Sequence, residues 1–428
     1  MINGYDDDEV GDEDAFISAG DVLQEVPADE HEPMDDGDDA PDDDDDYSPP
    51  SNALQAFTAH TGSVFCIAAH PSAPLAASGG EDDLGYIWDI TDGEVLVKLT
   101  GHTDSVGAVA FSADGEMVAT GGMDGRVRVW KRVGPEDYRR WTFVTELQGP
   151  DEVMWLRWHP KGNVLLAGSN DTTVWLWQLP SGTTMQVFAG HTGPVQCGQF
   201  TPDGKRILTA CAEGTLILWD PRSPTPVFKR APFGDGMDDA PPGITALAVN
   251  PASTIAVVGP PPGGVRVVSL SKGEVVGALV GGHKDGESIE AVVFLELGGK
   301  DVVVTGGTDG RACVWDLGTM RLRGMLEHQS CILPTSHATV PTSHATVAAP
   351  SNGTAATPSS GTAHTGTTPS SGTAHTGAGT APGTVKEHTG HRAPVLAAAL
   401  GLGGAVVLGA GDDGVCLVWT TEVDEEEL

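Results

Sequence analysis

Short stretches in which apolar and polar residues alternate recur along the chain, each after a turn rich in Gly and Asp. The clearest is TGGMDGRVRVW, residues 120–130. Alternation with a period of two after such a turn predicts a β-strand that pairs with the strand before the turn. Related stretches end at Trp88, Trp177, Trp219, Trp315 and Trp419. A degenerate copy, VGPPPGGVRVV, ends at Val268.

The copies up to Trp315 follow one another at steps of 42 to 49 residues. Most carry an Asp six residues before the terminal position, whereas the fourth copy has Glu213 there and the fifth has Pro262. Short strands repeated at this period are typical of a β-propeller, in which each repeat forms one four-stranded blade. The pattern therefore predicts an all-β fold with seven readable blades.

A second landmark is a His that stands 28 residues before the Trp in four copies. Together with the Trp endings, it resembles the WD40 repeat, and the resemblance covers 54–330 and 386–423. In that family His, Ser or Thr, the turn Asp and Trp form a hydrogen-bonded structural set inside each blade. The resemblance assigns this set to His60, Ser78, Asp82, Trp88, His102, Thr120, Asp124, Trp130, His191, Thr209, Trp219, Asp309, Trp315, His391, Asp413 and Trp419.

Two blades depart from this pattern. The third has Gly149 at the His position and Ala167 at the hydroxyl position. In the sixth, His283 stands 32 residues before Trp315, so we leave it outside the set. His, Asp and a hydroxyl group also make up a hydrolase triad. A group that recurs beside a buried Trp in several blades is instead expected to pair internally and to hold the turn.

The charge of the chain is strongly acidic, with 23 Lys and Arg against 60 Asp and Glu, or −37. Residues 1–50 hold 21 of these acids and no Lys or Arg, and they lack the apolar content to fold. This tail either keeps the protein soluble or attracts a cationic partner. A surface of this charge repels nucleic acid and anionic membranes and attracts basic proteins. We therefore expect a basic protein partner and no direct nucleic-acid binding.

A low-complexity segment interrupts the repeats. Residues 331–385 contain no charged and no aromatic side chain, and they include tandem copies of PTSHATV and TPSSGTAHTG. Such a composition predicts disorder. The predicted organisation is an acidic tail (1–52), blades one to six (53–330), the insertion (331–385), a last blade (386–423) and a short acidic tail (424–428). The resemblance to WD40 chains also implies that LQAFT (54–58), just before the first His, supplies the outer strand of the last blade and pairs near Val415–Trp419.

The spacing across the insertion leaves two alternatives. Trp315 and Trp419 are 104 residues apart, about two repeat lengths, yet one repeat is readable between them. Either blades six and seven meet directly around a looped-out insertion, or mistranslated repetitive sequence stands in place of an eighth blade.

Other functional classes find little support. The chain shows no secretory leader and no apolar run of membrane-spanning length, which predicts a cytoplasmic protein that can also be nuclear, and no membrane insertion. The Cys spacing fits neither a disulfide framework nor zinc. We find no phosphate-binding loop, no nucleophile paired with a base and no metal cluster. The expectation is a monomeric, non-enzymatic protein without cofactor or metal.

Further segments, among them GGEDDLGYIWDITDGE, VMWLRWHP and TACAEGTLILWD, resemble the angio-associated migratory cell protein family and its fungal counterparts. That family looks eight-bladed. The resemblance implies a chaperone that shields a basic large-subunit ribosomal protein during ribosome assembly. The alternative is a general scaffold in signalling, cell migration or ubiquitin-ligase adaptation.

The same resemblance indicates where a partner would bind. Propellers of this kind usually bind peptides at the end of the ring where the residue before each turn Asp emerges. Acidic residues at or near these positions are the candidates for binding a cationic segment: Glu81, Asp104, Asp151, Glu152 and Asp412.

Overall fold

The computed structural model describes residues 53–134, 138–234, 243–260, 264–297, 300–327, 395–402 and 405–420. The predicted acidic tails, the low-complexity insertion and His391 lie outside these residues. The described part contains no helix that is long and apolar enough to cross a membrane.

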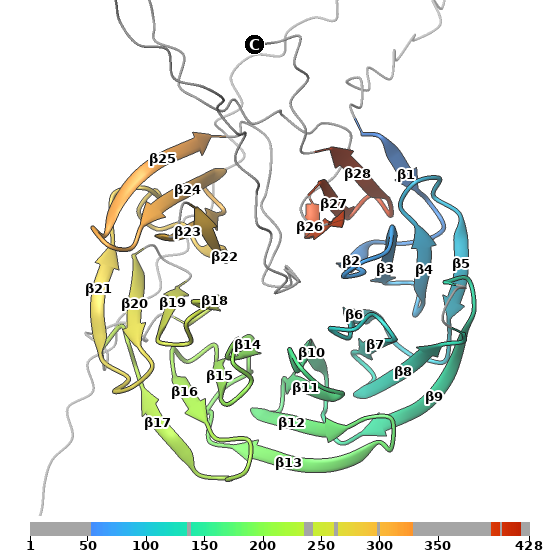
Figure 1. The fold of residues 1–428 in the computed structure, drawn as a ribbon, viewed down its shortest axis with the longest axis horizontal. Coiled ribbons are helices and arrows are strands. Elements are labelled where there is room, and N and C mark those ends of the chain that lie inside the picture. The colour runs from blue at the N-terminus through green and yellow to red at the C-terminus, as the bar shows by residue number, and fades with distance from the viewer. Residues whose placement is uncertain are drawn as a thin grey trace, which may run out of the picture. The chain divides into compact units, whose positions relative to one another are not determined.

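The described residues form 28 β-strands in seven four-stranded antiparallel sheets, which are the blades (Figure 1). This confirms the predicted all-β propeller. The innermost strands are β2 (Val64–Ala69), β6 (Val106–Phe111), β10 (Val153–Trp158), β14 (Cys197–Phe200), β18 (Ala246–Val249), β22 (Ile289–Leu297) and β26 (Val395–Gly401). The second strands are β3 (Leu75–Gly80), β7 (Met117–Gly122), β11 (Val164–Ser169), β15 (Ile207–Ala210), β19 (Ile255–Gly259), β23 (Lys300–Gly307) and β27 (Val406–Gly411).

The third strands are those that end at or near the repeated Trp: β4 (Gly85–Asp89), β8 (Arg126–Arg132), β12 (Thr173–Gln178), β16 (Leu216–Trp219), β20 (Val265–Ser269), β24 (Arg311–Asp316) and β28 (Cys416–Thr420). The outer strands are β5 (Val95–Leu99), β9 (Trp141–Gln148), β13 (Thr183–Ala189), β17 (Pro226–Arg230), β21 (Val275–Leu279), β25 (Arg321–Glu327) and β1 (Gln55–Phe57). Blades one to six each use four consecutive strands, beginning with β2 in blade one.

Blade seven is built from both ends of the described chain. Its strand order is β1-β28-β27-β26, and β1 pairs with β28 in the register Gln55↔Val418 and Phe57↔Cys416. The predicted pairing of residues 54–58 with the last repeat is therefore confirmed. Because the first strand completes the last blade, blade seven is joined to blade one through the backbone and through a shared apolar core.

The hydrophobic core lies between successive blades. Six clusters of buried side chains join blades seven and one, one and two, two and three, three and four, four and five, and five and six. The two Trp residues of β10 are buried and also bond across these junctions. Trp155 donates to the carbonyl of Val195 at 2.9 Å, and Trp158 donates to the carbonyl of Ala110 at 3.0 Å.

The junction between blades six and seven differs from the others. No core cluster of the described residues joins these two blades, and Figure 1 shows their ribbons apart. Val304 of blade six is partly exposed, whereas Leu166 and Leu208, at the same register in blades three and four, are fully buried. Val407, on blade seven, is also partly exposed. Within the described residues, blades six and seven are therefore not packed directly against each other.

Candidate functional site

The His, Asp and hydroxyl groups of the structural set lie together inside several blades. In blade one, Nδ1 of His60 lies 3.0 Å from a carboxylate oxygen of Asp82, and its Nε2 lies 2.9 Å from Oγ of Ser78. Blade two repeats this arrangement with His102, Asp124 and Thr120 at 3.1 and 2.7 Å. The hydroxyl groups belong to fully buried residues. A hydroxyl that is closed off from solvent cannot attack an external substrate, so these groups hold the turns.

The electrostatics of these groups agree with a structural role. Burial lowers the pKa of His102 despite the hydrogen bond and charge of Asp124. Burial acting alone would raise the pKa of Asp124. Hydrogen bonds from the backbone of Thr103, from His102 and from the backbone of Arg126 outweigh it and hold that pKa below its usual value. The carboxylate thus stays charged while the imidazole stays neutral near pH 7.

Blade six corrects the assignment made from spacing. His283, which we left outside the set, lies 3.1 Å from Asp309 and 2.8 Å from Thr305, and Trp315 donates to the same Thr305 hydroxyl at 2.7 Å. Two of the four additional residues lie before β22 and two lie in the longer hairpin of β22 and β23, and they do not move the His away from the turn. The spacing between His and Trp was therefore a poor guide in this blade.

Blades three and four each lack part of the His, Asp and hydroxyl set, with different consequences. In blade three, the ring of Trp175 occupies the space beside Gly149, because a Cβ at Gly149 would approach it to 2.3 Å. In blade four, His191 bonds to Thr209 at 2.7 Å, but its Nδ1 has no partner among the described residues. Glu213 replaces the turn Asp in this blade and makes no hydrogen bond to Nδ1 of His191. Burial lowers the pKa of His191 to about 3.

The residues before the turn Asp form a rim at one end of the ring. In five blades the backbone N–H of this residue donates to a carbonyl at the start of the same blade. The pairs are Glu81 to Ser63, Met123 to Ser105, Asn170 to Glu152, Ala212 to Pro194 and Thr308 to Ser288, at 2.9 to 3.0 Å. The rim therefore has a backbone held by the same bond from blade to blade. Pro261, the corresponding residue of blade five, lies outside the described residues.

The five acidic candidates all lie at this rim end. Glu81 and Asp412 approach the same residue from two blades. Glu81 accepts from the backbone of Ser63 at 3.3 Å, and Asp412 accepts from its hydroxyl at 2.6 Å. Asp104 accepts from the backbone N–H of Ser105, which follows it, at 2.8 Å. In blade three, Glu152 accepts from the side chain of Asn170 at 3.1 Å, and Asp151 next to it is exposed.

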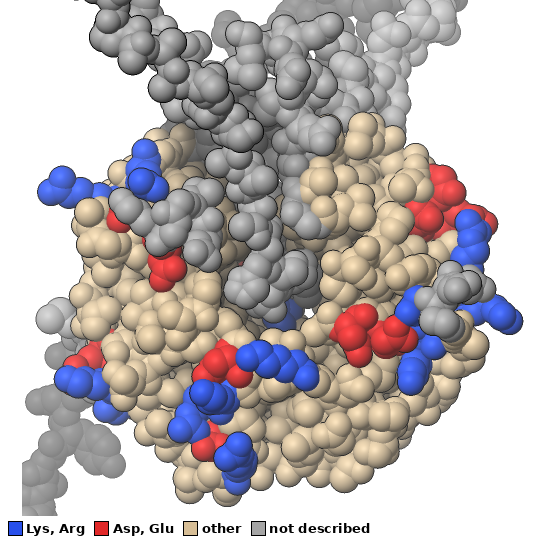
Figure 2. All heavy atoms as spheres, viewed as in Figure 1, with Lys and Arg blue, Asp and Glu red and all other residues tan. Residues whose placement is uncertain are grey.

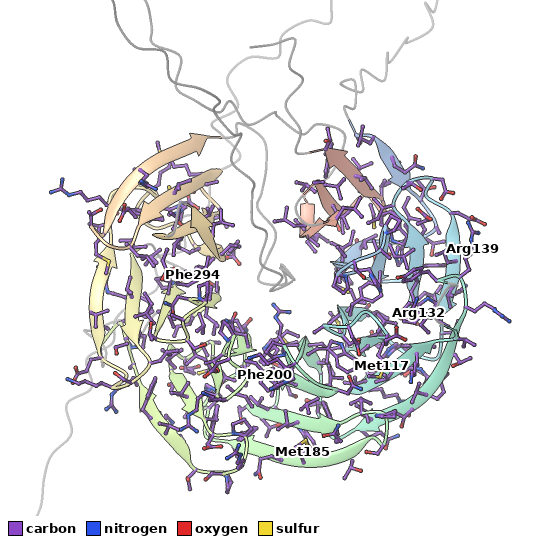
Figure 3. All side chains as sticks on the ribbon, in the orientation of Figure 1. Met117, Arg132, Arg139, Met185, Phe200 and Phe294 are labelled. Carbon is purple, nitrogen blue, oxygen red and sulfur yellow. The ribbon has the colours of Figure 1, made fainter. Side chains whose placement is uncertain are left out.

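The two ends of the ring differ in whether their acidic side chains form ion pairs. At the opposite end, acids are paired with cations: Arg206 with Asp220, Arg132 with Glu116, and Arg139 with Glu94. Figure 3 places Arg132 and Arg139 at the outer side of blade two, and Figure 2 shows a face on which Lys and Arg lie beside Asp and Glu. Among the described residues, none of the five rim acids forms an ion pair with Lys or Arg. Their charge is therefore available to a partner.

Sequence reasoning did not find one feature of the rim. Ser63 links blades seven and one through Asp412, a pair separated by 349 positions in the chain. Met123, which precedes the turn Asp of blade two, is 44% exposed, in agreement with the expectation that the residue at this position emerges. Within the described part of the chain, no three His, Cys, Asp or Glu side chains are grouped to hold a metal ion.

Comparisons with known proteins agree with this architecture. The family model for the WD domain, G-beta repeat, matches residues 51–89, 93–131, 141–178 and 182–220. An uncharacterised WD repeat-containing protein of Schizosaccharomyces pombe is 32% identical over 86% of this chain and 87% of its own length. The human angio-associated migratory cell protein is 28% identical over 66% of this chain, and the match spans 65% of the human protein.

Among solved structures, Sqt1 of Chaetomium thermophilum bound to the N-terminus of ribosomal protein L10 superposes with a TM-score of 0.68. The superposition covers 87% of this chain and 100% of Sqt1, at 23% identity, a level that establishes the fold alone. The repeat matches and the relative in S. pombe go further. The chain belongs to the WD40-repeat family.

Proposed function

We propose that this protein shields a basic segment of a large-subunit ribosomal protein before that protein joins the ribosome. The observation that carries the proposal is the set of five acids at one end of the ring without Lys or Arg partners in the described structure. Glu81, Asp104, Asp151, Glu152 and Asp412 come from four consecutive blades, seven, one, two and three.

The physical argument concerns the cost of holding these charges together. Like charges on a small surface repel one another, and an arriving cationic segment relieves that repulsion. Complementary charge also speeds encounter and makes the complex sensitive to salt. Ribosomal proteins built to bind RNA are basic, so before assembly they present the charge that this rim accepts. The solved complex of Sqt1, a protein of the same fold, with the N-terminus of L10 supports this choice of client.

Charge reversal at the rim tests the proposal. We expect Asp104→Lys combined with Asp151→Lys to abolish low-salt capture of a basic ribosomal protein from nuclease-treated lysate, as measured by mass spectrometry. The melting temperature should stay unchanged because both side chains are exposed.

The matched control reverses two exposed acids at the opposite end, Asp92→Lys and Glu274→Lys. Asp92 makes the same kind of local bond as Asp104, to the backbone of Glu94 at 2.8 Å. The control adds the same net charge and should keep the client. Equal yields of the same partners from the wild type and the rim variant would refute the proposal.

A further inference from the structure

The innermost strands carry a repeated irregularity near the rim. In blades one, two and three, the register with the second strand shifts between Val64 and Cys66, between Val106 and Ala108, and between Val153 and Trp155. Each shift is a β-bulge that leaves one residue unpaired. The residues concerned are Phe65, Gly107 and Met154. Bulges of this kind redirect a side chain and often lie at functional sites.

The bulges lie between residues that pack into different junctions. Val64 belongs to the core between blades seven and one, whereas Cys66, two positions later, belongs to the core between blades one and two. Regular alternation would place both side chains on one face of the sheet. The bulge at Phe65 therefore redirects the side chains at this point of β2, the innermost strand of blade one, whose free edge is turned toward the axis of the ring (Figure 1). The same holds for Gly107, between Val106 and Ala108.

This strip has an apolar surface with space above its centre. Phe65 and Met154 are partly buried, and Met154 also packs against the core between blades three and four, so each presents only part of its side chain to solvent. A Cβ at Gly107, which lies between them around the ring, would meet only the carbonyl oxygen of Val153, at 3.8 Å. Met123 lies at the same end of blade two, since its N–H bonds to Ser105, two residues before Gly107. We call Phe65, Gly107, Met123 and Met154 the apolar strip.

The strip lies among the acids of the rim. Glu81 belongs to the blade on one side, Asp151 and Glu152 belong to the blade on the other, and Asp104 lies three residues before Gly107. An apolar surface surrounded by unpaired carboxylates matches a segment that carries cations on both sides of a large apolar side chain. Charge complementarity thus indicates what covers the strip.

We propose that the apolar strip receives one large apolar side chain from the client segment and selects for it. This inference rests on the proposed function of the rim. It makes the preferred partner a basic segment with an embedded aromatic or long aliphatic residue, and not a purely cationic one. Burying such a side chain over Gly107 strengthens binding about tenfold.

Two synthetic peptides of equal charge test the proposal. Both carry several Arg residues spaced by Gly and Ser, and in the second a central Ser is replaced by Phe. We expect the full-length protein to bind the Phe peptide about tenfold tighter in fluorescence anisotropy. Gly107→Leu fills the strip, so this variant should bind both peptides alike, with the affinity that the wild type shows for the peptide without Phe.

The matched control is Gly324→Leu on the outer strand β25, where an added Cβ would meet nothing within 4 Å. This variant should keep the preference for Phe. If the wild type binds both peptides equally well, the strip does not select and the inference is wrong, while the acidic rim stands as a site for basic segments. If neither peptide binds, the rim itself is not such a site, and both proposals fall.

Discussion

Two adjacent residues of each turn have opposite surroundings. The turn Asp forms a buried inner layer, and the residue before it forms an exposed outer layer. Asp82, Asp124 and Asp309 have side chains at most 4% exposed, and each is bonded to a His. The residue before each of them, Glu81, Met123 or Thr308, emerges at the rim. The inner layer is constrained by burial, because an unpaired carboxylate there would be costly. The outer layer has no such constraint, so its residues are free to differ from blade to blade.

Blade two provides the strongest test of this difference. Asp124→Ala should lower the free energy of unfolding by about 1–3 kcal/mol, because it leaves three donors without their acceptor, among them the buried imidazole of His102. These donors are Nδ1 of His102 and the backbone N–H groups of Thr103 and Arg126, at 3.0 to 3.1 Å from the carboxylate. The neighbouring substitution Met123→Ala should stay within about 0.5 kcal/mol of the wild type in urea titration. Equal losses would show that the two layers do not differ.

The inner layer should also make stability depend on pH. His191 has its pKa lowered to about 3 by burial, whereas in the unfolded chain it has the ordinary value of 6.5. Between these values the unfolded state binds a proton that the folded state does not, so stability falls as the pH drops below 6.5. From about pH 7.5 to about pH 5.5, His191 should account for a loss of about 1.4 kcal/mol.

Urea titrations of wild type and His191→Gln at both pH values would measure this loss. The variant should be less stable throughout but should change less with pH than the wild type. Identical pH dependence in the two proteins would mean that His191 takes up its proton as readily in the folded state as in the unfolded state.

The smallest expected effect is a repair of blade four. Glu213→Asp restores the residue found at this turn in blades one and two, and the shorter carboxylate can then accept from Nδ1 of His191, which has no partner in the described structure. We expect a gain of about 0.5–1.5 kcal/mol in the free energy of unfolding. The same exchange at the rim, Glu81→Asp, should change stability by less than about 0.5 kcal/mol. A destabilised Glu213→Asp variant would show that the turn of blade four has diverged from the common geometry.

Much of the inner layer could be predicted from sequence, since a turn, its strand and its Trp lie within a few residues of one another. The pairing in blade seven was also predictable, because residues 54–58 precede the first His, where WD40 chains place the outer strand of the last blade. His283 was missed, because the His is linked to its turn across a loop whose length can vary without changing the bond. Trp175 was missed for another reason. It fills the space of a missing His, and no residue pattern indicates which neighbour will fill that space.

The sequence by itself determined the fold class, the number of blades in the described chain and the residues that hold the turns of blades one and two. These depend on contacts within one repeat, which the spacing of the repeat records. Only the tertiary structure decided that Glu81 and Asp412 meet at Ser63, that Phe65 and Met154 lie at bulges of the innermost strands, and that the described parts of blades six and seven are not packed together. These features arise where separate blades approach one another, and that approach depends on how whole sheets stack, not on the order of residues within any one of them.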